Sequence, residues 1–221
     1  MAVHARRYEV SKRAFDALAA AVLLVVLSPL LLAALLVVWL TMGSPVLFRD
    51  TRAGRAGRPF DLLKIRTMRD LRAGETVPES DRARITRVGR ALRSTSIDEL
   101  VSLVNVLRGE MSLVGPRPLP VRYVARYTAR QARRLEARPG VTGWAQVNGR
   151  NAVGWDERFE LDVWYVDHRS LRLDLRILGL TVRQVFSRSD IGHGDHATMP
   201  EFGVAEGGRP ETPGSNVQQR A

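Results

Sequence analysis

A long apolar segment near the start of the chain constrains its structure more than any other feature. From Ala17 to Met42 there is no charged side chain, and Ser28-Pro29 lies near the middle of this run. A bilayer core takes roughly 20 apolar residues in a helix, so the segment is long enough to span. Proline lacks an N–H and clashes with the preceding turn, so a helix bends or breaks there. Each arm, 17–28 or 30–42, would be about 18 Å long, too short to cross alone.

Basic residues flank both ends of the apolar segment, and such residues favour the cytoplasmic side of a membrane. Lys12 and Arg13 precede it, and Arg49 and Arg52 follow it. A re-entrant helix that bends at Ser28-Pro29 satisfies both ends, whereas a single kinked spanning helix does not, yet the residues alone leave both topologies open. The Ser28 hydroxyl is a candidate partner for backbone groups freed at the bend, because lipid offers none.

The net charge is +11, and only Lys12 and Lys64 are lysines, so arginine supplies nearly all of the positive charge. The planar guanidinium suits phosphate groups. Three kinds of partner would explain the surplus: anionic lipid headgroups, phosphate-bearing substrates and nucleic acid. The chain has no cysteine, which excludes disulfides, a thiolate nucleophile and a thiolate metal site.

Composition divides the chain into three parts. Residues 1–44 form a basic segment and the candidate membrane helix, and residues 45–202 are long enough for one domain. Residues 203–221 are rich in Gly, Pro, Glu and Gln and lack an apolar period, which predicts a disordered tail.

Local patterns predict several elements of the domain. Phe60 to Met68 is expected to contain a strand, and apolar residues after Ser96 recur at helical spacing. Ser96 followed by Glu99 matches a capping box for that helix. Residues 121–137 are expected to form one basic helix, and residues 141–151 a glycine-punctuated loop.

A last helix is expected from Leu175 to Phe186, where arginines interleave with an apolar stripe. That pattern is typical of a helix at a membrane interface, although a helix that faces the core and has a solvated basic face reads the same way. In the loop 139–151, Trp144 either lines a substrate pocket or serves as a packing anchor, and the residues leave both interpretations open.

Asp98 and Glu99 are the residues best placed to carry chemistry. Adjacent carboxylates at a helix start are commonly explained by the helix dipole alone. Here Arg93 lies shortly before the pair, and Arg117 stands in a loop clamped by prolines. Carboxylates, arginines and a helix start together could handle a phosphorylated substrate. Glu99 could also help to hold Mg²⁺, which prefers oxygen ligands.

Ordered motifs throughout residues 8–202 make the chain resemble the bacterial sugar transferases, the compact monotopic phosphoglycosyl transferases that act on polyprenyl phosphate. The motifs are Lys12-Arg13 with Asp16, Ser28-Pro29, 64–68 (KIRTM), 84–89 (RITRVG), Leu92-Arg93, 96–100 (SIDEL), 105–112 (NVLRGEMS), 114–118 (VGPRP), 139–151 (PGVTGWAQVNGRN) and 162–166 (DVWYV).

The resemblance implies a definite reaction. Such enzymes transfer a sugar-1-phosphate from a UDP-sugar to undecaprenyl phosphate and release UMP, as the first membrane step of exopolysaccharide, capsule, O-antigen or glycoprotein glycan assembly. It implies that Asp98 is the nucleophile of a covalent phosphosugar–aspartyl intermediate. It further implies that Glu99 binds Mg²⁺ as the cofactor, that Arg93 and Arg117 bind phosphate, and that Ser28-Pro29 breaks the helix.

The resemblance also implies an α/β, mainly helical fold, with a re-entrant membrane helix, a small cytoplasmic catalytic domain and interfacial amphipathic helices. The expected location is the cytoplasmic face of the bacterial inner membrane, with membrane lipid, polyprenyl phosphate and a nucleotide sugar as partners, and without nucleic acid. A homo-oligomer or glycan-assembly partners are possible. The alternatives are a membrane-anchored basic nucleic-acid-binding protein and a non-catalytic scaffold.

The family commonly continues Leu-Pro-Gln after the dyad, whereas this chain has Leu100, Val101 and Ser102. This departure removes no residue to which chemistry is assigned. The residues do not specify which sugar is transferred.

Overall fold

The computed structural model describes residues 2–76, 81–149, 154–187 and 202. Within these residues the fold is mainly helical, with two small two-stranded sheets, which confirms the coarse fold class. The predicted tail, 203–221, lies outside the described residues. The α-helices and strands are α1 (Ala2–Met42), β1 (Leu47–Ala53), β2 (Pro59–Ile65), α2 (Asp81–Arg84), α3 (Arg87–Ser94), α4 (Leu103–Arg108), β3 (Ser112–Val114), α5 (Ala129–Ala132), β4 (Gly140–Thr142), α6 (Trp144–Asn148), α7 (Trp155–His168) and α8 (Leu171–Ser187). The same ranges contain the short 3₁₀ helices η1 (Arg55–Gly57), η2 (Ile97–Ser102), η3 (Val121–Arg126) and η4 (Arg133–Glu136).

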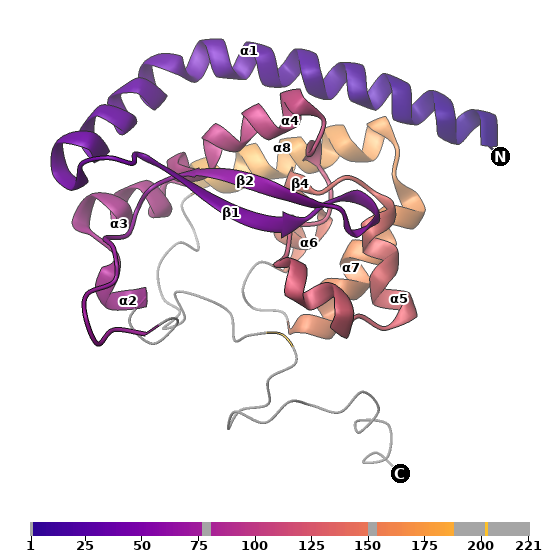
Figure 1. Ribbon diagram of the computed structural model, residues 1–221. Helices are drawn as coiled ribbons and strands as arrows, with labels where there is room; N and C mark the ends of the chain where they lie inside the picture. Colours follow the sequence, from indigo (N-terminus) through magenta and orange to yellow (C-terminus); the bar gives the residue numbers. More distant parts are fainter. Residues whose placement is uncertain (1, 77–80, 150–153, 188–201, 203–221) are drawn as a thin grey trace.

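Helix α1 arches over the rest of the molecule, with the β1–β2 hairpin and α4 beneath it (Figure 1). It is long and apolar enough to cross a membrane from Tyr8 to Met42. One face is buried against the domain along both halves, through Ala20 in the first and Leu31 and Val38 in the second. The opposite face leaves large apolar side chains such as Val25 and Leu32 exposed.

The helix is not broken at Ser28-Pro29, contrary to the sequence prediction. Pro29 lies inside one continuous α-helix. Because proline has no N–H, it cannot bond the carbonyl of Val25 one turn earlier. The Ser28 hydroxyl donates to that same Val25 oxygen at 2.7 Å, so the orphaned acceptor is satisfied locally. The predicted role of the Ser28 hydroxyl is therefore confirmed, and helical geometry passes through the proline.

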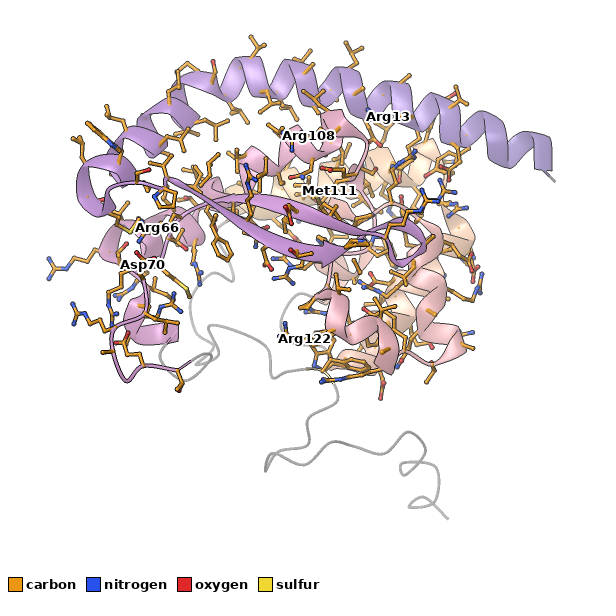
Figure 2. All side chains as sticks on the ribbon, in the orientation of Figure 1. Arg13, Arg66, Asp70, Arg108, Met111 and Arg122 are labelled. Carbon is orange, nitrogen blue, oxygen red and sulfur yellow. The ribbon has the colours of Figure 1, made fainter. Side chains whose placement is uncertain are left out.

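Buried polar contacts fasten α1 to the domain near its N-terminus. The Lys12 ammonium lies 2.8 Å from the Asp174 carboxylate of α8, and both side chains are almost fully buried. The Tyr165 hydroxyl of α7 donates to Asp174 at 2.7 Å. Arg13, labelled in Figure 2, donates to the backbone oxygens of Val106 and Leu107 at the end of α4. Removing one partner of such a buried pair typically costs about 3–5 kcal/mol, so α1 is an integral part of the fold.

The antiparallel β1–β2 hairpin is joined to α4 by one buried amide. Asn105 is fully buried; its oxygen accepts from the Leu63 N–H at 3.1 Å, and its nitrogen donates to the Asp61 carbonyl at 2.8 Å. The amide thereby satisfies one backbone donor and one backbone acceptor of β2. Strand β2 begins one residue before the predicted segment, Phe60 to Met68, and otherwise lies within it, and the Asn105 bonds hold it against α4.

Three local predictions differ from the structure. Ser96 adopts a left-handed conformation and makes no capping bond, so the predicted capping box is absent and the chain continues as the 3₁₀ helix η2. The predicted helix 121–137 is divided at Tyr127, which is extended, before Thr128 caps α5. The predicted loop 141–151 contains the end of β4 and the short helix α6. The last predicted helix, by contrast, is confirmed as α8.

Gly89 should be indispensable to the placement of α3. A Cβ atom there would lie 1.9 Å from the Thr67 carbonyl oxygen, so Gly89→Ala must displace the helix from the strand connection. We expect a lower melting temperature despite the better helix propensity of alanine. Gly179→Ala in α8 is the matched control, because nothing lies within 4 Å of the position that its Cβ would occupy. Thermal unfolding in detergent should show Gly179→Ala unchanged or slightly more stable; equal melting temperatures for both variants would contradict the close approach.

Candidate active site

The Glu99 carboxylate is held between two cations that come from separate elements. Its Oε1 accepts from the Lys64 ammonium of β2 at 2.9 Å and from the Arg117 guanidinium at 2.7 Å. Burial alone raises the pKa of Glu99, but the charges of Arg117 and Lys64 outweigh it and bring the pKa down to about 2. Glu99 is therefore a carboxylate at every physiological pH.

The neighbouring Asp98 has a different environment. Its side chain is buried, only 7% exposed, and it forms no ion pair within the described residues. Burial, together with the adjacent Glu99 charge, raises the pKa of Asp98, while the charges of Lys64 and Arg93 oppose the rise. The two carboxylates of the dyad thus differ. The negative charge of Glu99 is balanced by two direct ion pairs, whereas Asp98 is buried and has no cation in direct contact in the part of the chain that the structure describes.

Arg93 reaches the dyad from α3. Its Nε donates to the Thr67 hydroxyl at 2.9 Å, and its charge acts on Asp98 without a direct ion pair. Thr86 caps the start of α3 by accepting from the Gly89 N–H, so the helix begins at a defined residue. Arg93 thus acts on Asp98 through its charge, whereas Arg117 contacts Glu99 directly.

Close backbone contact fixes the loop that carries Arg117. Gly115 donates its N–H to Thr142, and Gly140 donates to Pro116. A Cβ on Gly140 would lie 2.1 Å from the Gly115 nitrogen, so only glycine permits this approach. Prolines on both sides of Arg117 further restrict the backbone. The guanidinium is thus carried on a rigid loop.

A cleft opens beside this cluster. Met111, labelled in Figure 2, is a buried residue of its lining. The lining residues are Arg52, Leu62, Lys64, Glu99, Ser102, Met111, Arg117, Pro118, Gly140 and Val141. The cleft combines cationic and apolar groups, which suits a ligand with phosphate and an uncharged moiety.

Of the predicted site residues, Glu99 and Arg117 line the cleft. Asp98 adjoins Glu99 and feels the charge of Arg93, but neither Asp98 nor Arg93 is among the lining residues. Ser28 and Pro29 lie on α1 and do not line the cleft. Sequence reasoning did not assign a role to Lys64. The available signal was the alternation along β2, where Lys64 follows buried Phe60 and Leu62 at every second position and so points to the same face.

The carboxylates of Asp98 and Glu99 could bind Mg²⁺ only together with a substrate phosphate and water. No group of three or more His, Cys, Asp or Glu residues that could hold a metal occurs among the described residues. Mg²⁺ commonly binds one or two carboxylates together with substrate phosphates and water. Asp98 and Glu99 fit that mode, whereas an all-protein metal cage does not.

Comparison with known proteins identifies the family. Residues 7–188 match the bacterial sugar transferase family, and the chain belongs to it. It is 52% identical over 191 residues to the uncharacterized sugar transferase EpsL of Bacillus subtilis, covering 86% of this chain and 95% of EpsL. It is 47% identical over 186 residues to the UDP-glucose:undecaprenyl-phosphate glucose-1-phosphate transferase of Caulobacter vibrioides, covering 79% of this chain and 69% of that protein.

A third relative carries a different sugar in its name. The chain is 37% identical over 197 residues to the undecaprenyl-phosphate galactose phosphotransferase of Salmonella typhimurium, covering 80% of this chain but 40% of that protein. Relatives of this chain are thus named for both glucose and galactose.

Because burial raises the pKa of Asp98, we expect its ionised carboxylate to destabilise the folded protein at neutral pH. A carboxyl whose folded pKa lies above its unfolded value loses stabilisation as the pH rises through the folded pKa. Asp98→Asn should therefore melt at a higher temperature than the native protein at pH 7, by about 2–4 °C for each kcal/mol regained. The difference should shrink as the pH falls through the raised pKa of Asp98, because the carboxyl is then neutral in the folded protein.

Asp167→Asn is the matched control for this measurement. Its hydrogen bond with Arg133 lowers the pKa of Asp167, so its charged form is favoured in the fold and the variant should gain no stability. An Asp98→Asn protein that melts at or below the native temperature at pH 7 would contradict the desolvated state of Asp98.

Proposed function

We propose that the chain transfers a sugar-1-phosphate from a UDP-sugar to undecaprenyl phosphate and releases UMP. The observation that carries the proposal is the arrangement of the dyad. Asp98 is buried next to Glu99, and the Glu99 carboxylate accepts hydrogen bonds from Lys64 and Arg117. The names of relatives that cover most of this chain support the same reaction class.

In the first step, an Asp98 oxygen forms a bond to the β-phosphorus of the UDP-sugar, and the bond from that phosphorus to the bridging oxygen breaks. UMP leaves with the bonding electron pair. In the second step, a phosphate oxygen of undecaprenyl phosphate attacks the same phosphorus, and the Asp98 oxygen departs as a carboxylate. The product is an undecaprenyl-diphosphate sugar. Burial favours Asp98 as the nucleophile, because a desolvated carboxylate is less stabilised by water.

Positive charge around the dyad would stabilise the transferring phosphoryl group. Phosphoryl transfer depends mainly on positioning and on neutralising the phosphate oxygens. Lys64 and Arg117 line the cleft and bond Glu99, and the charge of Arg93 acts on Asp98, so a diphosphate bound between the cleft and Asp98 would meet several cations. Mg²⁺ bound at Glu99 would supply further charge neutralisation to the diphosphate.

We place the catalytic domain at the cytoplasmic face of the bacterial inner membrane, with α1, an arched but unbroken helix (Figure 1), as a re-entrant anchor. Both halves of α1 pack on the same domain, while its outer face is apolar. A helix that spanned the bilayer could not keep one aqueous domain against both of its ends. α8 leaves Leu175, Val182 and Val185 exposed, which suits an interfacial helix. The lipid phosphate would then reach the cleft at headgroup level.

A UMP-release assay with protein in nanodiscs tests the proposed reaction. We expect release from a UDP-sugar only when undecaprenyl phosphate and Mg²⁺ are both present, and loss of release with EDTA. A screen of UDP-glucose, UDP-galactose and N-acetylated UDP-sugars would identify the donor. Asp98→Asn should lower turnover at least about 10³-fold, because no nucleophile remains.

Asp70→Asn is a suitable control, because the Asp70 carboxylate is 88% exposed and pairs with Arg66 (both labelled in Figure 2), and neither residue lines the cleft. It should retain native turnover. Full activity of Asp98→Asn would refute the assigned nucleophile. Absence of turnover with every sugar would instead favour a non-catalytic scaffold.

A further inference from the structure

A buried arginine, Arg134, connects the active-site loop to α7. Its side chain is 3% exposed and Asp162 is 1% exposed, so both charges lie inside the protein. Arg134 Nε and Nη2 donate to the same Asp162 oxygen at 3.0 and 2.7 Å. A buried ion pair of this kind needs further hydrogen bonds to offset the loss of hydration.

The remaining donors of Arg134 reveal a second connection. Its Nη2 also donates to the backbone oxygen of Arg117 at 2.7 Å, and its Nη1 donates to the Tyr127 hydroxyl at 3.3 Å. The guanidinium also lies over the rings of Tyr127 and Phe159. One planar group thus joins η4, α7 and the loop that carries the Arg117 side chain.

We propose that Arg134 and Asp162 are positioning residues that hold the backbone of Arg117, so that the Arg117 guanidinium stays on Glu99 and in reach of substrate phosphate. This inference rests on the proposed function for its catalytic consequence, but not for the tether itself. The loop is already fixed before Arg117 by the contact between Gly115 and Gly140. Arg134 fixes it after the Arg117 Cα, and the two anchors together define the direction of the side chain.

If the Arg134–Asp162 pair had only a structural role, it would simply join η4 to α7 and would not affect Arg117. The neighbouring pair Arg133 and Asp167 makes that connection from the same two elements. It is exposed, at 38% and 40% for the two side chains. The Arg133 guanidinium bonds Glu136 and Asp167, and neither residue belongs to the Arg117 loop. This second pair gives a matched comparison: the same elements and the same ion types, without the bond to Arg117.

Arg134→Lys tests the hydrogen bond to the Arg117 backbone separately from the positive charge of Arg134. Lysine keeps the positive charge beside Asp162, so no buried carboxylate is left unpaired. It lacks the planar fork and cannot bond Asp162 and the Arg117 carbonyl in the same geometry. We expect kcat/KM to fall about 10- to 100-fold, mainly through kcat, because small displacements of a positioned group are costly. Arg133→Lys should leave it unchanged.

The loss should vanish when Arg117 is already removed. In the Arg117→Ala background, adding Arg134→Lys should change kcat/KM by less than about 3-fold, because contacting residues couple and their effects do not add. An equal loss in both backgrounds, or native activity of Arg134→Lys, would overturn the proposal. If Arg134→Lys does not fold, Tyr127→Phe removes one contact of Arg134 and should give the same pattern at smaller size; an effect that persists without Arg117 would again overturn it.

A spectroscopic readout tests the tether without catalysis. The chain has no cysteine, so Arg117→Cys alone places a single nitroxide label on the loop while its backbone carbonyl remains. We expect the label to be more mobile in the Arg134→Lys background and unchanged with Arg133→Lys. An unchanged label in both would overturn the tether. A mobile label in a protein that releases no UMP from any sugar would support the tether and refute the proposed function.

Discussion

The Glu99 carboxylate, held by Lys64 on one side and Arg117 on the other, is the interaction on which the rest of the site depends. It joins a strand, a 3₁₀ helix and a loop that are distant in sequence. Each element is fixed independently: β2 by the buried Asn105 amide, and the Arg117 loop by the approach of Gly115 to Gly140. Because its charge is balanced by these contacts, Glu99 stays ionised beside Asp98 and helps to raise the pKa of that second carboxyl.

The anchor and the active site are parts of one packed unit. α1 contributes to two hydrophobic clusters, and its Lys12 pairs with Asp174 inside the domain. A helix that is apolar outside and buried inside along both halves brings the domain close to any membrane that accepts its outer face. For a reaction whose acceptor is a lipid phosphate, this arrangement would restrict the search for substrate to the membrane surface. The same packing means that changes in α1 will affect the stability of the domain.

Much of the site could be predicted from the sequence, because its motifs are local. The dyad, Arg93 and Arg117 were all predicted as site residues, and the structure brings them near one another; their catalytic and binding roles stay predictions. Lys64 was missed, although its alternation with Leu62 indicated the correct face. Its contact with Glu99 joins two distant segments, and no local pattern reveals such a pair. Arg134 was missed for the same reason: among many arginines, only tertiary structure shows that this one is buried against Asp162.

The wrong predictions have physical causes that arise from tertiary contact. Glu99 matched the capping position for Ser96, but two cations compete for its carboxylate, and the cap does not form. Pro29 indicated a broken helix, yet the Ser28 hydroxyl satisfies the freed Val25 carbonyl and the helix continues. The basic segment 121–137 was predicted as one helix, whereas Tyr127 leaves helical geometry and its ring packs against Phe159.

Peptide mapping by mass spectrometry tests the division of labour within the dyad most directly. The protein would be incubated with its UDP-sugar and Mg²⁺ in the absence of undecaprenyl phosphate, quenched, digested and fragmented. A phosphosugar adduct on Asp98, which disappears when undecaprenyl phosphate is added, is the expected result. An adduct on Glu99, or turnover at native rate with no adduct at either carboxylate, would contradict the roles assigned to the two residues.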